Sequence, residues 1–305
     1  ELIRFGCDFS SLKIDFTNKS RQQTAEIMIK NKREATLNGV KKKSPVLLGE
    51  ELKAVIFSPV HLSMIKDGPD ERRRFADGAL CQIKSGYRNI LKEYNKALAQ
   101  RNSLLKDIAF NSSLSDMLYI WDKSFAKYGA KIIYQRQKYI EALTPYAKEI
   151  FNGLSNGRED IDLVLTGAFD YKNLTLDEIE NKLMIALQNN RQADMIMKIT
   201  TIGPHRDDIE ILINGNSARK YGSQGQQRSC VLALKLAEAS LLREKTQDEP
   251  VALLDDVMSE LDEGRQDYIL NHIKDWQVFI ACCDPASVLR LKQGKTFHIN
   301  DGKLI

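Results

Sequence analysis

Long hydrophobic runs are missing from this 305-residue sequence, and so are low-complexity segments. The longest uninterrupted apolar run, at positions 278–283, has six residues, whereas a transmembrane helix needs about 20. Glycine and proline are sparse, with 17 and 7 residues, while hydrophobic residues make up 43% and charged residues 28%. A membrane-spanning, collagen-like or disordered chain is therefore excluded, and the length suggests about two compact domains.

Paired cysteines and a secretion signal are absent too. The five cysteines are odd in number, and none lies in a Cys-x-x-Cys pair, which argues against a disulfide framework and a zinc site. No basic start is followed by an apolar stretch, as a secretory signal requires. We therefore expect a protein of the reducing cytoplasm with no membrane partner.

The net charge is low, but it is unevenly distributed along the sequence. The whole chain has a formal charge of +4. Residues 1–100 hold 19 basic and 12 acidic side chains, a net charge of +7, so the other 205 residues sum to −3. Positions 248–263 contain seven acids and no base. A basic surface and an acidic cluster are therefore expected in different parts of the molecule.

Hydrophobic periodicity divides the chain into three parts. In the first 57 residues apolar and polar residues alternate, and Asn38-Gly39 is a hairpin signal, so a small antiparallel sheet is expected. Residues 68–192 have apolar residues every three or four positions and are expected to be mostly helical. Strand and helix patterns then alternate to the end. We predict an α/β fold in which a core of residues 1–65 and 196–305 carries an inserted helical arm of residues 66–195.

Individual elements are predicted within these parts. One helix is expected over residues 68–97, and a second over residues 114–144, until Pro145 interrupts it. An isolated strand is expected at residues 162–165, and a further strand at residues 197–202. The alternating part predicts a mixed sheet with helices on both faces.

Two adjacent carboxylates follow a short apolar run near the end of the chain. Val251-Ala-Leu-Leu-Asp255-Asp256 reads as a buried strand with both acids at its carboxyl end, where α/β sheets place ligands. Neighbouring carboxylates raise one another's pKa unless a cation lies between them. A hard cation such as Mg²⁺ would resolve this repulsion, whereas an acidic turn after a strand is the alternative interpretation.

A glycine-rich segment precedes that strand by one helix. In Tyr221-Gly-Ser-Gln-Gly-Gln-Gln-Arg228, two glycines permit close backbone approach, and Ser223 can cap a helix expected over residues 223–243. Free amides at such a helix start bind anions, so phosphate is the natural ligand. An ordinary serine-capped helix is the alternative interpretation.

The two segments together resemble the signature, Walker B and D-loop sequence of ATP-binding-cassette ATPases, because one helix separates them and Ser259-Glu-Leu-Asp262 follows. Within that superfamily, Ser-Gln-Gly-Gln-Gln-Arg, Leu-Leu-Asp-Asp-Val and the Gly-Pro-His-Arg-Asp-Asp of residues 203–208 are similar to the RecF family of bacterial recombination mediators. Phe57-Ser-Pro and Arg72-Arg-Arg-Phe-Ala-Asp77 extend the resemblance over nearly the whole chain.

The resemblance implies roles for the matching residues. Those that would face the γ-phosphate of ATP held by a second subunit are Ser223, Gln224, Gly225 and Gln226. Asp255 would bind Mg²⁺, Asp256 would polarise the attacking water, and Asp262 of the D-loop would act across the dimer interface. His205 and Arg206 lie in a family motif to which the sequence assigns no mechanism, and a histidine beside proline is more often structural.

The chain departs from the family pattern in several places, and two of these departures bear directly on ATP hydrolysis. Asp256 stands where cassette ATPases usually carry glutamate, and its shorter side chain reaches the water less well, so slow hydrolysis is expected. A phosphate loop of the form GxxxxGK[ST] is missing, because Gly294-Lys295-Thr296 has Leu289 where the first glycine belongs. Family members carry this loop upstream of the segment that resembles Glu1-Leu-Ile-Arg-Phe-Gly6. We therefore expect this chain alone to hydrolyse no ATP, and a complete protein to be a weak, DNA-stimulated ATPase.

Basic clusters in the first hundred residues are the predicted contacts to DNA. They are Arg72, Arg73 and Arg74, and Lys41, Lys42 and Lys43. For each cluster a solvated charged face is the alternative interpretation. No helix-turn-helix or zinc-finger pattern is present, so contact with the DNA backbone rather than with base edges is expected.

Three functions are consistent with the sequence. The first is an ATP-dependent homodimeric clamp on gapped or junction DNA, with double-stranded and single-stranded parts, that promotes RecA loading in recombinational repair; by resemblance its partners are RecR and RecO. The second is a head domain of the chromosome-maintenance (SMC) or double-strand-break repair (Rad50) type, although the insertion of about 130 residues lacks the sustained heptads of a coiled coil. The third is a non-catalytic DNA-binding scaffold.

Overall fold

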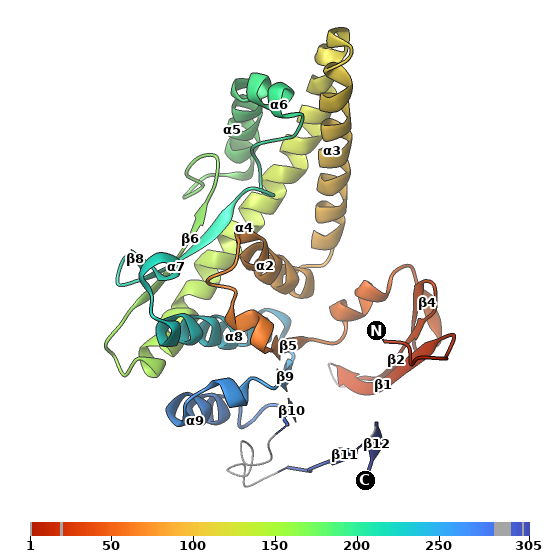
Figure 1. Ribbon diagram of the computed structural model, residues 1–305, viewed down its shortest axis with the longest axis vertical. Coiled ribbons are helices and arrows are strands. Elements are labelled where there is room, and N and C mark those ends of the chain that lie inside the picture. The colour runs from red at the N-terminus through yellow and green to blue at the C-terminus, as the bar shows by residue number, and fades with distance from the viewer. Residues whose placement is uncertain (1, 19–20, 284–293, 301) are drawn as a thin grey trace.

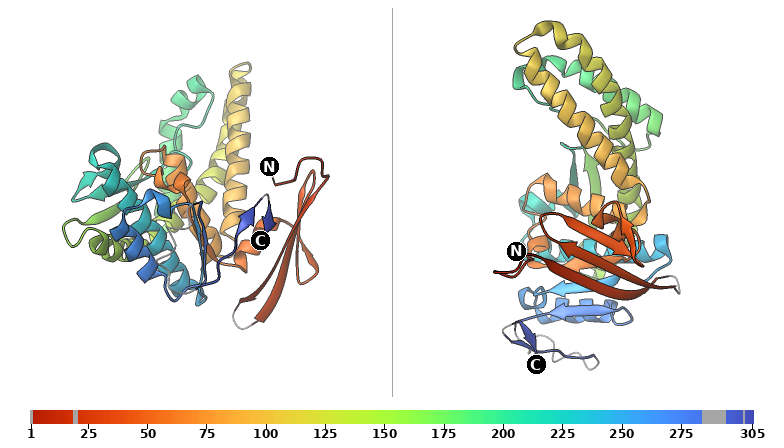
Figure 2. Two further views of the ribbon diagram at one scale, coloured as in Figure 1. Left: turned by 60° about the horizontal axis from the view of Figure 1, so that its bottom comes forward. Right: turned by 90° about the vertical axis from the view of Figure 1, so that its right-hand side faces the viewer.

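The computed structural model of the chain describes residues 2–18, 21–283, 294–300 and 302–305. Two long antiparallel helices, α3 (Tyr87–Ile108) and α4 (Leu118–Leu154), project from a body that contains the sheets and helix α8 (Gln224–Thr246), as Figure 1 shows. Figure 2 shows that the N-terminal strands form a separate sheet at one side of this body. In the described ranges no helix is long and apolar enough to cross a membrane.

Four antiparallel strands form the N-terminal sheet: β1 (Ser10–Asn18), β2 (Arg21–Ile29), β3 (Arg33–Leu37) and β4 (Val40–Lys42). The alternating pattern places Leu12 opposite Ile27, on the same face of the sheet. Between β3 and β4, Asn38 and Gly39 have φ angles of 51° and 78°, as a tight hairpin turn with two left-handed residues requires. The predicted hairpin is therefore confirmed.

A three-stranded parallel sheet lies in the body, in the order β10 (Val278–Ala281), β9 (Val251–Asp255) and β5 (Ala54–Phe57). Ala252 and Leu254 are buried on the face that joins the core formed by α8 and α9 (Glu263–His272). On the opposite face Ile56 and Phe279 are 46% and 55% exposed. In the part of the chain that the structure describes, the helix layer is therefore present on one face of this sheet.

A third sheet connects the arm to the body. It has the order β6 (Ile161–Thr166), β7 (Asp208–Ile213) and β8 (Asn216–Ser217), and a short hairpin of β11 (Ile299–Asn300) and β12 (Lys303–Leu304) follows later in the chain. The strand predicted as isolated is β6, and that prediction is wrong in one respect, because β6 pairs with β7 along its whole length. Since β6 belongs to the predicted arm and β7 to the predicted core, one sheet joins the two.

The remaining helices complete the arm and its base. Near the outer end of the arm lie α5 (Leu176–Asn189) and α6 (Arg191–Met197), beside α4 (Figure 1). The other helical segments are α1 (Pro59–Leu62), α2 (Pro69–Ile83), α7 (Ala218–Tyr221) and the 3₁₀ turns Pro45–Glu50, Ser112–Met117 and Met258–Glu260.

Two helix boundaries differ from the prediction. The single helix expected over residues 68–97 is broken between α2 and α3, where Gly86 has a φ of 83°, a left-handed conformation that no helix interior contains. The interruption expected at Pro145 does not occur, because α4 continues through it to Leu154. Leu143 and Ala147 are almost fully buried on either side of the proline, so tertiary packing outweighs its cost of about 3 kcal/mol.

The strand expected at residues 197–202 is also not formed. Met197 ends α6, and Lys198 has a left-handed φ of 57°. The backbone amides of Thr200 and Thr201 donate to the side chains of Asn102 and Asp194, at 2.8 and 2.9 Å, instead of to a neighbouring strand. Side-chain hydrogen bonds therefore replace a sheet ladder here.

One continuous hydrophobic core joins arm and body. It includes Phe125 and Phe151 of α4, Leu236 of α8 and Ile269 of α9, all with no exposed surface. A smaller cluster at the outer end of the arm consists of Leu104, Leu105, Ile108 and Leu118.

Candidate functional site

Helix α8 begins at a capping box. The Ser223 hydroxyl accepts a hydrogen bond from the Gln226 amide at 3.2 Å, and the Gln226 side-chain oxygen accepts one from the Ser223 amide at 2.7 Å. The predicted serine cap is therefore confirmed. Ser223 and Gln224 are exposed, so the unpaired amides of the first turn face outward, as an anion site requires.

The Gln226 side chain also connects this helix start to the arm. Its amide nitrogen donates to Glu159, in the loop between α4 and β6. The glutamine predicted to face a phosphate is thus engaged within its own subunit at both ends. Glu159 was not predicted, because the sequence offers no signal that this loop returns to α8.

Arg265 holds the start of α8 against the D-loop, and the motifs did not reveal this. Its guanidinium donates to the Gly225 carbonyl at 3.1 Å and to the Ser229 hydroxyl at 2.9 Å, and it forms an ion pair with Asp262. A Cβ at Gly225 would lie 3.2 Å from the guanidinium, so the glycine allows this close approach. The only sequence signal is an arginine three residues after Asp262, in the first turn of α9.

The D-loop has a second link to α8. Arg228 donates to the Glu260 carbonyl at 2.6 Å and to its carboxylate at 2.9 Å. Asp262 caps α9 by accepting a hydrogen bond from the Arg265 amide at 3.1 Å. Although burial opposes it, hydrogen bonding to Arg265 and the charge of its guanidinium hold the pKa of Asp262 below its ordinary value. The signature and D-loop residues therefore form one connected unit.

The two predicted carboxylates at the end of β9 differ in their surroundings. Asp255 is exposed, and within the described ranges nothing engages its carboxylate in a hydrogen bond or ion pair. Asp256 has a left-handed φ of 50°, and its amide donates to the Ala281 carbonyl of β10 at 2.9 Å. Ser259 donates to the Asp256 carbonyl at 2.9 Å. Aspartate tolerates this conformation better than most residues, and such local strain often accompanies functional sites.

Asp255 fits the requirements of a magnesium ligand. No cluster of three or more His, Cys, Asp or Glu side chains that could hold a metal is found among the residues that the structure describes. Mg²⁺ is usually held by one or two carboxylates and completes its shell with phosphate oxygens and waters. A free, exposed carboxylate at the end of a buried strand is therefore a suitable ligand for Mg²⁺ that arrives with a nucleotide.

The histidine of the Gly-Pro-His-Arg motif has a structural environment. The Tyr94 hydroxyl lies 2.6 Å from Nδ1 of His205, and Nε2 lies 3.1 Å from the Thr200 carbonyl. Since a carbonyl only accepts, Nε2 carries the proton and Nδ1 accepts from the tyrosine. Burial lowers the pKa of His205 to about 4, so the ring is neutral at pH 7. His205 thus connects α3 to the loop before β7.

Buried charges hold the rest of that loop. Arg136 of α4 donates to the Pro204 carbonyl at 2.6 Å and binds Asp77 of α2 through both carboxylate oxygens, at 2.9 and 2.8 Å. Asp207 accepts from the Tyr171 hydroxyl at 2.8 Å, and burial raises the pKa of Asp207 to about 6. Arg206 is exposed on this firmly held loop. The motif is therefore a junction between helices of the arm and β7.

One of the basic clusters predicted to contact DNA is mostly engaged inside the protein. Arg72 is 3% exposed, binds both carboxylate oxygens of Asp208 at 2.7 and 2.9 Å, and donates to three backbone carbonyls. Arg73 donates to the Asp207 carbonyl at 2.6 Å and pairs with Asp70. Arg72 is therefore not part of the predicted DNA surface, because its guanidinium is buried and held by Asp208 and three backbone carbonyls.

The other predicted basic residues reach solvent. Arg74 is 73% exposed and pairs with Glu71. Lys41 is 68% exposed and lies 3.0 Å from Glu34 across the β3–β4 pair. In the same lysine cluster, Lys42 is half-buried and Lys43 is exposed. These residues remain candidates, although Arg74 and Lys41 are partly neutralised by their acidic neighbours.

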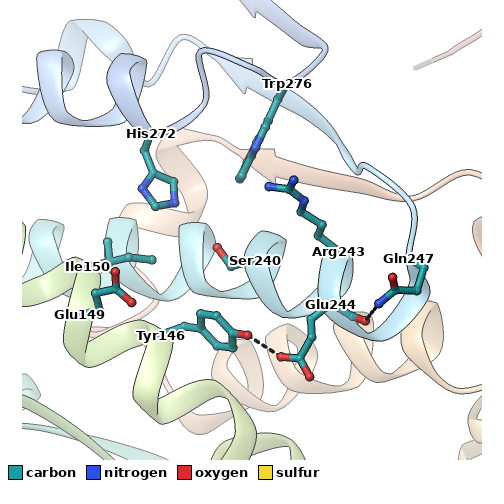
Figure 3. A pocket seen from close by; sticks show the side chains of 9 residues that line it. All are labelled: Tyr146, Glu149, Ile150, Ser240, Arg243, Glu244, Gln247, His272 and Trp276. Atoms are coloured by element: carbon teal, nitrogen blue, oxygen red, sulfur yellow. Dashed lines mark hydrogen bonds between the residues drawn. The ribbon is translucent and has the colours of Figure 1, made fainter.

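A cavity of about 500 Å³ lies apart from the predicted site residues, between α4, the end of α8 and α9. Figure 3 shows Tyr146, Arg243, His272 and Trp276 around it, with the Tyr146 hydroxyl bonded to Glu244. None of the predicted site residues lines it. Ser223, Gln224 and Asp255 are exposed instead, as expected for a site completed by a second subunit.

Comparison with known sequences identifies close relatives. No protein-family model matches the chain. The DNA replication and repair protein RecF of Lachnospira eligens is 40% identical over 311 residues, which cover 100% of this chain and 83% of that protein. RecF of Lachnoclostridium phytofermentans is 44% identical over 241 residues, or 79% of this chain and 64% of that protein, so the match spans less than two thirds of this relative.

Solved structures agree with the sequence relatives. A recombination mediator protein RecF described with ATPrS in the RecFOR pathway matches with a TM-score of 0.91 and 36% identity, covering 99% of this chain and 81% of the other. An SMC head bound to a winged-helix domain of ScpA has a TM-score of 0.51 and 15% identity over 98% of this chain and 74% of the other, which shows a shared fold alone. The predicted α/β fold of an ATP-binding-cassette head with an inserted helical arm is confirmed.

Proposed function

Because the chain belongs to the RecF family of DNA replication and repair proteins, we propose that it works as an ATP-gated homodimeric clamp on DNA. Two copies would enclose ATP between them, hold gapped or junction DNA, and release it after slow hydrolysis. Support for the choice of nucleotide comes from RecF structures described with ATP and with ATPrS. The SMC alternative is less favoured, because its structural match has only 15% identity.

The observation that carries this proposal is the connected unit of signature and D-loop. Arg265 joins Gly225 to Asp262, and Arg228 joins α8 to Glu260. The start of α8 after Ser223 and the carboxylate of Asp262 are therefore held in one fixed relation. In a two-fold dimer this unit would meet the nucleotide of the other subunit as a single rigid surface.

The chemistry would be divided between the two subunits. Asp255 would hold Mg²⁺, which when bound neutralises phosphate charge. Asp256 would orient and polarise the attacking water, and Ser223 with the amides of α8 would stabilise the γ-phosphate from the opposite subunit. The cis phosphate contacts would come from a GxxxxGK[ST] loop, which these 305 residues do not contain. The side chain of Asp256 is shorter than that of glutamate and reaches the attacking water less well, so ATP turnover would be slow. Slow turnover suits a protein that ATP switches between two states.

The proposed partners follow from the family. RecR and RecO would act with the clamp on gapped DNA, since the matching RecF structure is described as part of the RecFOR pathway. Loading of RecA onto the gap would be the outcome.

Light scattering on a gel-filtration column tests the clamp. The chain is extended at Glu1 with a GxxxxGK[ST] segment of the kind that family members carry, and its mass is measured with and without a slowly hydrolysed ATP analogue. We expect a monomer without nucleotide and a dimer with it. Ser223→Arg should block dimerisation, because the arginine fills the surface that meets the opposite γ-phosphate, whereas the control Ser103→Arg, on the exposed side of α3, should not. ATP-dependent dimers of Ser223→Arg would refute a signature acting in trans.

A further inference from the structure

One side of α4 carries lysines interspersed with tyrosines. This lysine–tyrosine stripe consists of Tyr119, Lys123, Lys127, Tyr128, Lys131 and Tyr134. Lys123 and Lys127 are exposed and Lys131 is half-buried. The stripe starts at the outer end of the arm and runs toward the body along the helix (Figure 1).

No acidic group on α4 neutralises the stripe. Between Tyr119 and Lys138 the helix contains a single acid, Asp122, which is 3% exposed and bound to Arg101 at 2.7 Å. In the described ranges, Lys123, Lys127 and Lys131 have no ion-pair partner. Beyond the stripe, the next lysine of the helix, Lys138, is paired with Glu141 at 2.8 Å. Three uncompensated positive charges therefore remain on one helix face.

The tyrosines hold the lysines near the helix surface. The Lys123 ammonium lies 4.6 Å from the ring centre of Tyr119, and that of Lys131 lies 5.7 Å from the ring centre of Tyr128. Such cation–π contacts restrict long side chains without removing their charge. Tyr119 is itself 49% exposed, so its ring can also stack on an unpaired base.

The spacing of the lysines suits a phosphodiester backbone. Lys123, Lys127 and Lys131 recur every four residues, so they follow one ridge of the helix at intervals of about 6 Å. The ridge from Lys123 to Lys131 spans about 12 Å, the rise of three to four nucleotides of one strand at ~3.4 Å each. Basic residues interleaved with aromatic ones are typical of nucleic-acid surfaces.

Most residues of the sequence-predicted clusters lack these properties. Arg72 is buried, while Arg73, Arg74 and Lys41 are each paired with a carboxylate. We propose that the lysine–tyrosine stripe of α4 is the surface through which the arm contacts the phosphate backbone of DNA. The proposal rests on the DNA-binding function proposed above and assigns that function to a particular helix.

Fluorescence anisotropy with labelled duplex and single-stranded DNA tests the assignment on the chain extended with a phosphate-loop segment, in the presence of a slowly hydrolysed ATP analogue. The test variant replaces Lys123, Lys127 and Lys131 by glutamine, which keeps helix propensity but removes charge. We expect its association constant to fall on the order of 10²-fold at ~0.1 M salt, and its slope of log K against log salt to decrease by about 3. If the variant loses more affinity for duplex DNA than for single-stranded DNA, the stripe contacts the duplex; the opposite result indicates the single strand.

The control variant replaces Lys245, Lys274 and Lys303 by glutamine, three exposed lysines outside the arm, and should bind as the wild type does. Circular dichroism should show that both variants are folded. If the wild type binds DNA and the α4 variant binds equally tightly, the stripe serves another anionic partner and the proposal is overturned. If the wild type itself binds neither DNA form, the DNA-binding function fails as well, so the two failures are distinguishable.

Discussion

Arg265 offers the sharpest test of the connection between signature and D-loop. Arg265→Ala removes the hydrogen bonds to the Gly225 carbonyl and the Ser229 hydroxyl and the ion pair with Asp262. Hydrogen bonds from a charged donor contribute about 1.5–3 kcal/mol each, and an exposed ion pair contributes up to about 1 kcal/mol. The arginine side chain is 28% exposed, so water can replace part of this bonding when the side chain is removed. We therefore expect a loss smaller than the sum of these contributions, about 2–3 kcal/mol in the free energy of unfolding.

Urea denaturation followed by circular dichroism measures this loss. Arg265→Lys should fall between the wild type and Arg265→Ala, because lysine keeps the charge but cannot bridge three acceptors. A change of less than about 0.5 kcal/mol for Arg265→Ala, the usual size of a surface substitution, would refute the structural part of the reasoning.

The positioning role has its own readout. In the chain extended with a phosphate-loop segment, Arg265→Ala should weaken ATP-dependent dimerisation. The matched control is Ile269→Val, which destabilises the same helix by about 1 kcal/mol without touching the start of α8. If both variants dimerise equally well, Arg265 stabilises α9 but does not position the start of α8 for dimerisation.

Two further predictions concern chemistry and pH. In the extended chain, Asp256→Asn should lower ATP turnover on the order of 10²-fold with dimerisation retained, and Asp256→Glu should raise turnover, both measured by phosphate release. His205 should make the protein acid-sensitive: its folded pKa of about 4 lies below the unfolded value of 6.5, so its stabilisation is complete above pH 6.5 and is lost as the pH falls toward 4. That loss is about 3 kcal/mol, and urea denaturation of His205→Gln should show unfolding free energies that depend less on pH over this range.

Local sequence signals predicted the start of α8 and the end of β9 correctly. A serine cap followed three residues later by glutamine, and four apolar residues followed by two acids, depend on near neighbours alone. The helix break at Gly86 was missed because Ile83 and Tyr87 continue the apolar spacing across it. At Pro145 a helix break was predicted but does not occur, because packing of the residues around the proline in α4 outweighs the missing hydrogen bond.

Residues that act through distant partners could not be found from sequence. Arg72 looked like a free cation until folding brought Asp208, 136 residues away, to its guanidinium. Arg265 meets Gly225 across 40 residues, and Glu159 meets Gln226 across 67. Charge and motif patterns locate groups along the chain, while these roles depend on which helices pack together.

The central claim, that two subunits share each ATP site, is tested most directly by measuring ATP turnover per subunit of the extended chain as its concentration is raised. A composite site predicts that turnover per subunit rises with protein concentration and levels off once the protein is dimeric by light scattering, with Asp256→Asn as the blank. Turnover per subunit that stays constant while the protein changes from monomer to dimer would contradict the account.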